Sequence, residues 1–326
     1  MPSAGRVHRQ LTYGCICFYS GDMTVAAVRQ QLAAAFRAVS PSPQLDADCI
    51  LQHVLNCDKT QLLLRRADML TASQLAAVRA AADRRKTGLP IAYITGHKEF
   101  FGYDFLVTPA VLIPKPDTEL LVELALQAVH LFAGENARSV CDMCAGSGCV
   151  GVSLLCALSD SGAVAPPLTL TLSDSSAEAL AVARQNADRL LPPAALGQVR
   201  FVQSDLFARF SQTFDLIVAN PPYVPHDEAL SLLQDGRGEP LIALDGDVAE
   251  DGTIESRDGL SLIRRLVPQA YARLVSGGAL LMETGEYNAE AAAALCQTAG
   301  FCDVVIERDL SGQLRVVCAR KPVRVD

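Results

Sequence analysis

The stretch SVCDMCAGSG, residues 139–148, decides the fold of this chain. Its first half is an apolar run of strand length, and its second half is a glycine-containing turn that leads into an apolar helical stretch from Cys149. Glycines at such a turn let the backbone approach a ligand closely, and the N-terminus of the helix offers free N–H groups. The order of strand, turn and helix predicts an α/β fold with a nucleotide-type site, without identifying the cofactor.

Downstream of this stretch, apolar strands alternate with helical patterns, the clearest of which are Ser176–Leu190 and Leu260–Leu274. Near-continuous apolar strands between helices predict a parallel sheet covered on both faces. The last two strands are too close in sequence for a crossover helix, so the final strand should run antiparallel. We therefore expect a class I Rossmann-like, seven-stranded, mostly parallel sheet. Its strands should be Ser139–Met143, Leu168–Ser173, Val199–Gln203, Phe214–Ala219, Ala279–Glu283, Val304–Glu307 and Arg315–Ala319.

Three segments precede the sheet domain, which we place at residues 116–326. Residues 1–22 are expected to be a disordered extension. Residues 23–90 show helical spacing, with a capping box at Thr71 and Gln74, and predict a small helical bundle. Residues 91–115 are rich in aromatic and β-branched side chains around glycines, which predicts a linking β-hairpin. The helical bundle is open to two interpretations, a scaffold and a docking domain for a protein substrate.

Composition restricts the class of protein. The chain has 326 residues and a net charge of −8, without a long block of lysine and arginine, which argues against a dedicated nucleic-acid binder. Eleven cysteines, an odd number, are scattered through apolar stretches and are typical of reduced core residues in a cytoplasmic protein. Cys141 and Cys144 have CxxC spacing, but no second pair with histidines accompanies them, and we expect no metal site. No apolar run reaches the length of a membrane span.

Acidic residues follow the next two expected strands. Asp174 comes at the end of the second strand, where a carboxylate can accept hydrogen bonds from both ribose hydroxyls. Asp205 follows the third strand and is placed to accept an adenine amino proton, while Leu206 packs on the ring. The chain has no GxxxxGK[ST] loop, which excludes a P-loop ATPase. An NAD-type enzyme remains open on these residues alone.

The fourth expected strand ends in Asn220-Pro221-Pro222-Tyr223. A side-chain amide is a poor nucleophile because its nitrogen lone pair is delocalised into the carbonyl. The Asn220 side-chain carbonyl and the Pro221 main-chain carbonyl, held by the rigid Pro-Pro step, can accept both N–H groups of such an amide. Tyr223 can stack on its plane. We interpret the four residues as the catalytic and substrate-binding site for methyl transfer to a planar amide or amino nitrogen.

Several further motifs are similar to those of one family. They are Tyr93-Ile94-Thr95-Gly96, Glu99-Phe100-Phe101-Gly102, Val111 to Glu119, Glu239-Pro240, Asp258-Gly259-Leu260, Glu283 and Gly285, and Asp309 and Arg315. With NPPY, these motifs resemble the PrmC/HemK family of peptide-chain release factor glutamine methyltransferases over nearly the whole chain from Met23.

The resemblance implies transfer of a methyl group from S-adenosyl-L-methionine to the amide nitrogen N5 of the glutamine in the GGQ motif of class I release factors. The implied cofactor contacts are Cys144, Ala145, Gly146, Ser147, Gly148, Asp174, Leu206 and Asn220, and Phe100 is implied to close over the methionine end. We expect a monomer with release factors as its partners and with neither stable nucleic acid binding nor a membrane.

The chain also departs from the family pattern. Cys144 stands where glycine is frequent, which predicts an ordinary backbone angle there. Lys115 and Asp117 replace arginine and glutamate, and Asn288 replaces glutamine. Residues 247–257 are expected to be an acidic insertion in the substrate-side loop. Three alternatives stay open: a glutamine methyltransferase of a ribosomal protein, a DNA adenine N6-methyltransferase, and a cofactor-binding module without activity.

Overall fold

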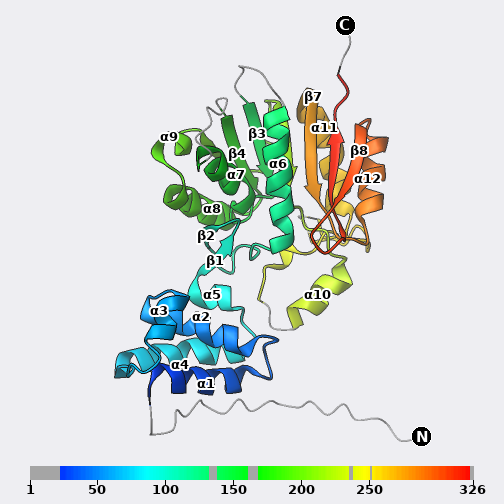
Figure 1. Cartoon of the computed structure of the whole chain (residues 1–326). Coiled ribbons are helices and arrows are strands. Elements are labelled where there is room, and N and C mark those ends of the chain that lie inside the picture. The colour runs from blue at the N-terminus through cyan, green and yellow to red at the C-terminus, as the bar shows by residue number, and fades with distance from the viewer. Residues whose placement is uncertain (1–22, 132–137, 161–167, 235–237, 250–251, 324–326) are drawn as a thin grey trace, which may run out of the picture. The chain divides into compact units, whose positions relative to one another are not determined.

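The computed structural model describes residues 23–131, 138–160, 168–234, 238–249 and 252–323. The chain divides into two compact units, one that ends at Thr95 and one that begins at Gly96 (Figure 1). The extension expected at residues 1–22 lies outside the described residues. In the described part of the chain, no helix is both long enough and apolar enough to cross a membrane.

The first unit is a helical bundle, as predicted. Its elements are α1 (Val25–Phe36), α2 (Pro43–Leu55), α3 (Lys59–Leu64), α4 (Ala72–Lys86) and α5 (Ile91–Thr95). Leu32 and Phe36 of α1 pack against Ile50 and Leu51 of α2 in its core. The capping box that begins α4 is confirmed, since Thr71 and Gln74 exchange side-chain and backbone hydrogen bonds. Short α3, with a second capping box at Asp58, was not predicted.

The hairpin is shorter than the sequence predicted. Residues 91–95 form helix α5 instead of strand, because Pro90 opens a turn in which its carbonyl accepts the N–H groups of Tyr93 and Ile94 at 3.1 and 3.2 Å. The second unit then begins with the antiparallel strands β1 (His97–Phe100) and β2 (Tyr103–Leu106). The turn between them places Phe101 and Gly102 at positive φ, 53° and 78°.

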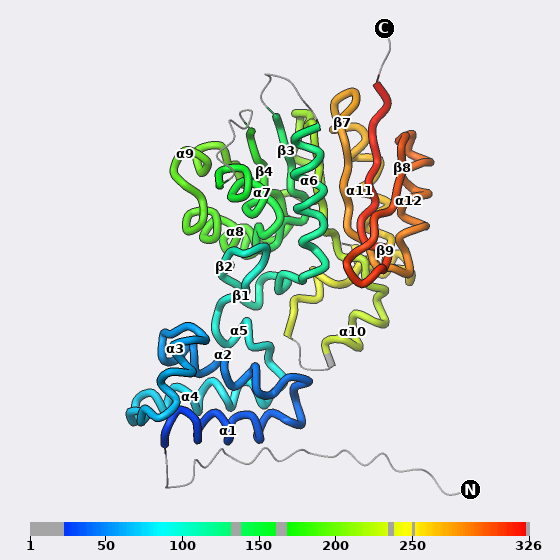
Figure 2. Tube along the Cα trace, viewed as in Figure 1, coloured from blue at the N-terminus to red at the C-terminus, as the bar shows by residue number. Residues whose placement is uncertain are grey.

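A seven-stranded sheet forms the centre of the second unit, in the order β5-β4-β3-β6-β7-β9-β8. Its strands are β3 (Arg138–Met143), β4 (Leu168–Asp174), β5 (Val199–Gln203), β6 (Phe214–Ala219), β7 (Leu274–Glu283), β8 (Cys302–Arg308) and β9 (Leu314–Arg320). The mostly parallel sheet and the antiparallel direction of its final strand are confirmed. Figure 2 follows the chain through the tight turn that inserts β9 between β7 and β8.

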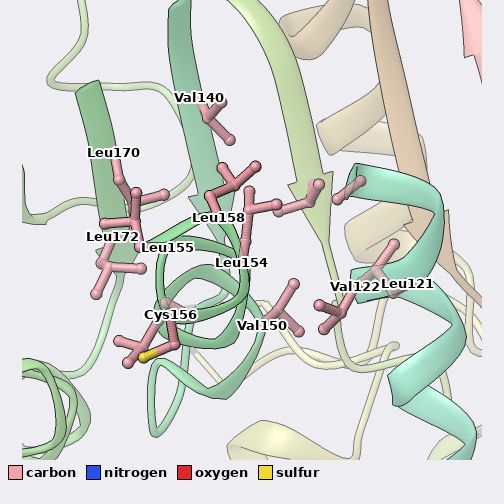
Figure 3. Packing of buried hydrophobic residues seen from close by; sticks show 14 of the residues in the cluster. Leu121, Val122, Val140, Val150, Leu154, Leu155, Cys156, Leu158, Leu170 and Leu172 are labelled. Carbon is pink, nitrogen blue, oxygen red and sulfur yellow. The ribbon is translucent and has the colours of Figure 1, made fainter. Parts of the chain in front are cut away.

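Two helical layers cover the sheet, because successive strand residues point to opposite faces. On β3, Val140 packs with α6 (Glu119–Leu131), α7 (Cys149–Asp160) and α8 (Ala177–Leu190). Cys141, the next residue, packs with α11 (Ser261–Arg273) and α12 (Ala289–Thr298) on the other face. Figure 3 shows Leu154 and Leu158 of α7 against Val140 in the first of these layers. The shorter helical elements are η1 (Pro116–Thr118), α9 (Pro193–Leu196), α10 (His226–Gln234) and η2 (Leu241–Ala243).

One buried side chain, that of Asn186, links the β1–β2 hairpin to the turn after β3. Asn186 of α8 is fully buried and accepts the N–H of Leu106 at 2.7 Å. Its amide nitrogen donates to the carbonyls of Leu106 and Ser147 at 3.0 and 2.9 Å. Three backbone groups, two at the end of β2 and one in the turn after β3, therefore depend on one amide for their hydrogen bonds.

We predict that Asn186→Ala lowers the free energy of unfolding by roughly 3 kcal/mol, because it leaves three buried backbone groups without their partner. Urea denaturation measures this change. Gln203→Ala is the control, since Gln203 makes one exposed hydrogen bond to Ser175 and should cost less than about 1 kcal/mol. Equal losses in the two variants would contradict the role of Asn186.

Candidate active site

A cavity of about 470 Å³ lies at the carboxyl ends of β3, β4, β5 and β6. Parallel strands deliver their last residues to one edge of a sheet, so side chains far apart in sequence meet there. The predicted residues that line the cavity are Cys144, Ala145, Gly146, Ser147, Asp174, Asp205, Leu206, Asn220 and Pro222. Gly148, Pro221 and Tyr223 are not among the lining residues. Phe100 is also absent from the wall, because its ring is buried in the hydrophobic core against Phe105.

The turn after β3 is strained at Cys144. Its φ is +61°, in the left-handed region that L-residues seldom adopt, so the expectation of an ordinary backbone angle was wrong. The chain reverses direction here within a few residues, with the N–H of Ala145 donating to Ser173 at 3.0 Å and that of Gly148 to Ala145 at 2.7 Å. Gly148 packs closely against α8, since a Cβ there would lie 3.1 Å from the Cβ of Ala183.

The thiols of Cys141 and Cys144 are held in their neutral form. Burial raises the pKa of both well above the usual thiol value, and neighbouring Asp142 adds to the rise in each. The two side chains belong to the sheet core and the cavity wall, respectively.

Asp174 holds the two turns that border the cavity. One carboxylate oxygen accepts the N–H of Gly146 at 2.8 Å, and the other accepts the N–H of Ser176 at 2.9 Å. Burial raises the pKa of this carboxyl, while these backbone hydrogen bonds oppose the rise. Each carboxylate oxygen can accept more than one hydrogen bond. Asp174 can therefore bind a ligand's hydroxyl groups without releasing the turns.

A second carboxylate, Asp142, was missed by the sequence reasoning. It is buried, lines the cavity and accepts the N–H of Gly151 at 2.9 Å, which satisfies one donor in the first turn of α7. Burial raises its pKa to about 7, against the effect of that hydrogen bond. Because Asp142 lies inside an apolar strand pattern, no spacing signal separates it from an ordinary strand residue.

Asp205, just after β5, has a charged partner. Its carboxylate forms an ion pair with Arg265 of α11, and both side chains line the cavity. Arg265 is a second residue that the sequence reasoning missed, because it occurs within a helical pattern remote from the strand ends. Next to Asp205, Leu206 is buried at a φ of +44° and forms part of the cavity wall.

The loop after β6 is held by side chains from three other segments. The amide nitrogen of Asn220 donates to the hydroxyl of Thr118 at 3.3 Å. The hydroxyl of Tyr223 donates to Glu283 at 3.1 Å, so the Tyr223 side chain is engaged with the end of β7. Asn288, one of the family departures, donates to the Tyr223 main-chain carbonyl at 3.0 Å.

The other two departures also keep polar partners. Lys115 pairs with buried Glu239 at 2.6 Å, and Asp117 lies 3.4 Å from Arg315. Lys115 and Asp117, which both precede α6, therefore each form an ionic contact.

Two glycines fit against the backbone of the same loop. A Cβ on Gly259 would lie 2.1 Å from the carbonyl oxygen of Tyr223, and one on Gly246 would lie 2.8 Å from that of Pro222. Asp247 is fully buried between them and accepts the N–H of Gly259 at 2.9 Å and that of His226 at 3.2 Å. Asp247, the first residue of the expected acidic insertion, is therefore a buried structural residue of the site.

Two family models match this chain, the PrmC N-terminal domain over residues 27–96 and the methyltransferase small domain over residues 117–235. The release factor glutamine methyltransferase of Burkholderia pseudomallei is 39% identical over 293 residues, which span 89% of this chain and 96% of that protein. The chain belongs to the release factor glutamine methyltransferase family. A second relative with the same name, from Bordetella pertussis, is 39% identical over 276 residues, 84% of this chain and 93% of that protein. The family member from Koribacter versatilis is 38% identical over 288 residues, 87% of this chain and 94% of that protein.

We predict that Gly259→Ala reduces turnover at least about 100-fold, because the added Cβ must displace the Tyr223 carbonyl and with it the Asn220–Tyr223 loop. Gly312→Ala is the matched control. Gly312 has a similar φ, 82° against 74°, but a Cβ there meets no atom within 4 Å. Both variants carry the backbone strain, and only Gly259→Ala should lose activity in a steady-state assay. Comparable activity in the two would show that loop placement does not depend on Gly259.

Proposed function

We propose that this protein transfers a methyl group from S-adenosyl-L-methionine to the side-chain amide nitrogen N5 of the glutamine in the GGQ motif of class I release factors. The observation that carries the proposal is the position of Asn220 and Pro222 on the wall of the cavity formed by the strand ends, in a member of this family. The sequence matches its relatives over most of their length, including both the helical unit and the sheet domain.

The cavity residues suit this cofactor. A volume of about 470 Å³ is within the usual range for small-molecule sites. Asp142, Asp174 and Asp205 give the walls carboxylates that favour a cationic ligand, partly offset by Arg265. Asp174 would hold the ribose hydroxyls, Leu206 the adenine ring, and the Cys144–Ser147 turn the methionine part. When bound, the cofactor supplies a methyl group on a positively charged sulfur, which is the electrophile of the reaction.

The chain's own residues make the substrate amide reactive by orienting it. The Asn220 side-chain carbonyl and the Pro221 main-chain carbonyl accept the two N–H groups of the glutamine amide and stabilise the positive charge that develops on its nitrogen. The Pro221-Pro222 step fixes these acceptors in place. No strong base is needed before transfer, because the proton can leave the methylated nitrogen afterwards. Alignment of this kind is worth about 7–11 kcal/mol in well-oriented systems.

The helical unit, residues 23–90, is proposed to dock the release factor. Its support is the match to the PrmC N-terminal domain and the exposure of Leu63, Leu64 and Met69, which are 62%, 79% and 63% exposed. We also propose a monomer as the working form. A cytoplasmic location follows from the substrate, since release factors act on ribosomes.

A substrate panel tests the proposal against its alternatives. Purified protein and tritiated S-adenosyl-L-methionine are incubated separately with a class I release factor, ribosomal proteins and duplex DNA. We expect label in the release factor and none when its GGQ glutamine is replaced. Label in a ribosomal protein or in DNA would favour the sibling activities, although the net charge of −8 argues against DNA. Cofactor binding without any label would leave a binding module.

We predict that Asn220→Ala lowers kcat about 100- to 1000-fold and leaves the cofactor dissociation constant within a few-fold of the unmodified protein. The alanine removes the acceptor for the substrate N–H but leaves the carboxylates around the cofactor intact. Steady-state kinetics and calorimetry measure the two quantities separately. A similar loss in binding and turnover would assign Asn220 to the cofactor instead of the substrate.

We predict that Asp174→Ala raises the dissociation constant of S-adenosyl-L-methionine at least tenfold, equivalent to about 1.4 kcal/mol. The variant removes the acceptors for the ribose hydroxyls and also releases the N–H groups of Gly146 and Ser176. Circular dichroism checks that the variant is folded. Unchanged affinity by calorimetry would remove Asp174 from the cofactor site.

A further inference from the structure

The segment from the last residue of β7 to the residue before α12, residues 283–288, lies beside the loop that follows β6. β6 and β7 are neighbouring parallel strands, with Ala219 opposite Met282. The chain therefore leaves both strands at the edge of the sheet where the cavity lies. Three side chains of this segment form hydrogen bonds to Tyr223. These side chains, which we call the Tyr223 clamp, are those of Glu283, Tyr287 and Asn288.

The clamp holds both the side chain and the backbone of Tyr223. The Tyr223 hydroxyl donates to Glu283 at 3.1 Å. The Tyr223 main-chain carbonyl accepts two donors, the hydroxyl of Tyr287 at 3.3 Å and the side-chain amide nitrogen of Asn288 at 3.0 Å. A carbonyl oxygen has two lone pairs, so both donors can bind it at the same time. Three contacts from one short segment therefore fix the position of one residue.

Two members of the clamp are not explained by packing or by helix formation. Asn288 occupies the N-cap position of α12, where an asparagine oxygen commonly accepts a backbone N–H, yet its side chain makes no capping bond. Its Oδ1 atom and the Oε2 atom of Glu283 are buried and have no hydrogen-bond partner in the part of the chain that the structure describes. A buried oxygen without a partner lowers stability. The contacts that both residues do make are those to Tyr223.

The third member, Tyr287, reaches its position over a glycine. Its side chain is 57% exposed, so burial in the core does not hold the ring. A Cβ on Gly285 would lie 2.8 Å from two atoms of the Tyr287 ring. The ring therefore lies against the backbone of Gly285, which has no side chain to displace it, and its hydroxyl points to the Tyr223 carbonyl.

We propose that the three residues of the Tyr223 clamp are positioning residues for methyl transfer, which fix the Pro221 carbonyl through Tyr223. Tyr223 is not among the residues that line the cavity, whereas Pro222 is. The Pro221-Pro222 step is rigid because each proline ring fixes its own φ. A displacement of Tyr223 therefore displaces the Pro221 carbonyl as well. The inference rests on the proposed function, because that carbonyl is the acceptor for the glutamine N–H.

The other acceptor of the site is held separately. The amide of Asn220 donates to the hydroxyl of Thr118, at the opposite end of the loop from Tyr223. Asp174 and the turn after β3, which are proposed to hold the cofactor, make no printed contact with the clamp in the described residues and belong to other strand ends. Loss of the clamp should therefore misplace one acceptor and leave cofactor binding intact.

The two donors to the Tyr223 carbonyl are tested by Tyr287→Phe, Asn288→Ala and the double variant. Because either donor alone can still hold the carbonyl, we predict that each single change lowers kcat about 2- to 5-fold and that both together lower it about 100-fold. KM for a purified class I release factor and the cofactor dissociation constant should stay within a few-fold. Asn288→Gln keeps the amide and should keep most of the turnover. Tyr103→Phe is the control, since the Tyr103 hydroxyl binds Asp160 at 2.7 Å and its loss should leave kcat unchanged.

The contact with the Tyr223 hydroxyl is tested at Glu283. We predict that Glu283→Met, which removes the acceptor, lowers kcat about 10- to 100-fold, and that Glu283→Gln, which keeps an acceptor oxygen, retains most of it. Tyr223→Phe should lower kcat as much as Glu283→Met. The two changes together should lower it no further, because they remove the same hydrogen bond. Circular dichroism checks folding, and Tyr223→Phe tests the same bond if Glu283→Met does not fold.

Three results would overturn the proposal. They are a loss in the Tyr287→Phe, Asn288→Ala double variant that equals the product of the single losses, a loss in KM or in cofactor binding instead of kcat, and unchanged turnover in Tyr223→Phe. Failure of the unmodified protein to methylate the release factor would instead overturn the proposed function.

Discussion

The site depends on holding one side-chain amide, that of Asn220, in a single orientation at the end of β6. An amide has a donor end and an acceptor end of nearly equal size, so packing alone does not choose between them. In this chain the choice is made by buried polar groups, with Thr118 as acceptor for the amide nitrogen. Asp247 and the close backbone contacts of Gly246 and Gly259 hold the rest of the loop in place. Burying carboxylates such as Asp247 costs stability unless their oxygens are hydrogen-bonded, as they are here to backbone donors.

Much of the fold was predictable because the sheet is long, apolar and regular. The expected strand Phe214–Ala219 matches β6, and the predicted antiparallel final strand is β9. The predictions were wrong where local contacts outweigh the secondary-structure preference of the residues. Residues 91–95 form α5 because the Pro90 carbonyl accepts the N–H groups of Tyr93 and Ile94. Cys144 adopts a positive φ because the turn after β3 must reverse within a few residues. The insertion of β9 beside β7 depends on pairing that no local pattern contains.

The candidate site, too, was predictable from the sequence only in part. Asp174, Asp205 and Asn220 could be predicted because each follows a strand, and parallel strands bring their ends together. Thr118, Arg265 and Asp247 could not, since each comes from a helix or loop whose spatial neighbour lies far away in sequence. Asp247 was assigned to an acidic insertion in the substrate-side loop. Its side chain is instead buried by hydrogen bonds to backbone donors.

The central claim is that two carbonyl acceptors after β6 select a side-chain amide nitrogen for methylation. The most direct measurement is the mass of a class I release factor after reaction with this protein and S-adenosyl-L-methionine, with fragmentation to locate the added mass. The account predicts one methyl group, on the side-chain nitrogen of the GGQ glutamine. A methyl group on a main-chain atom, on another residue type, or on several residues would contradict it.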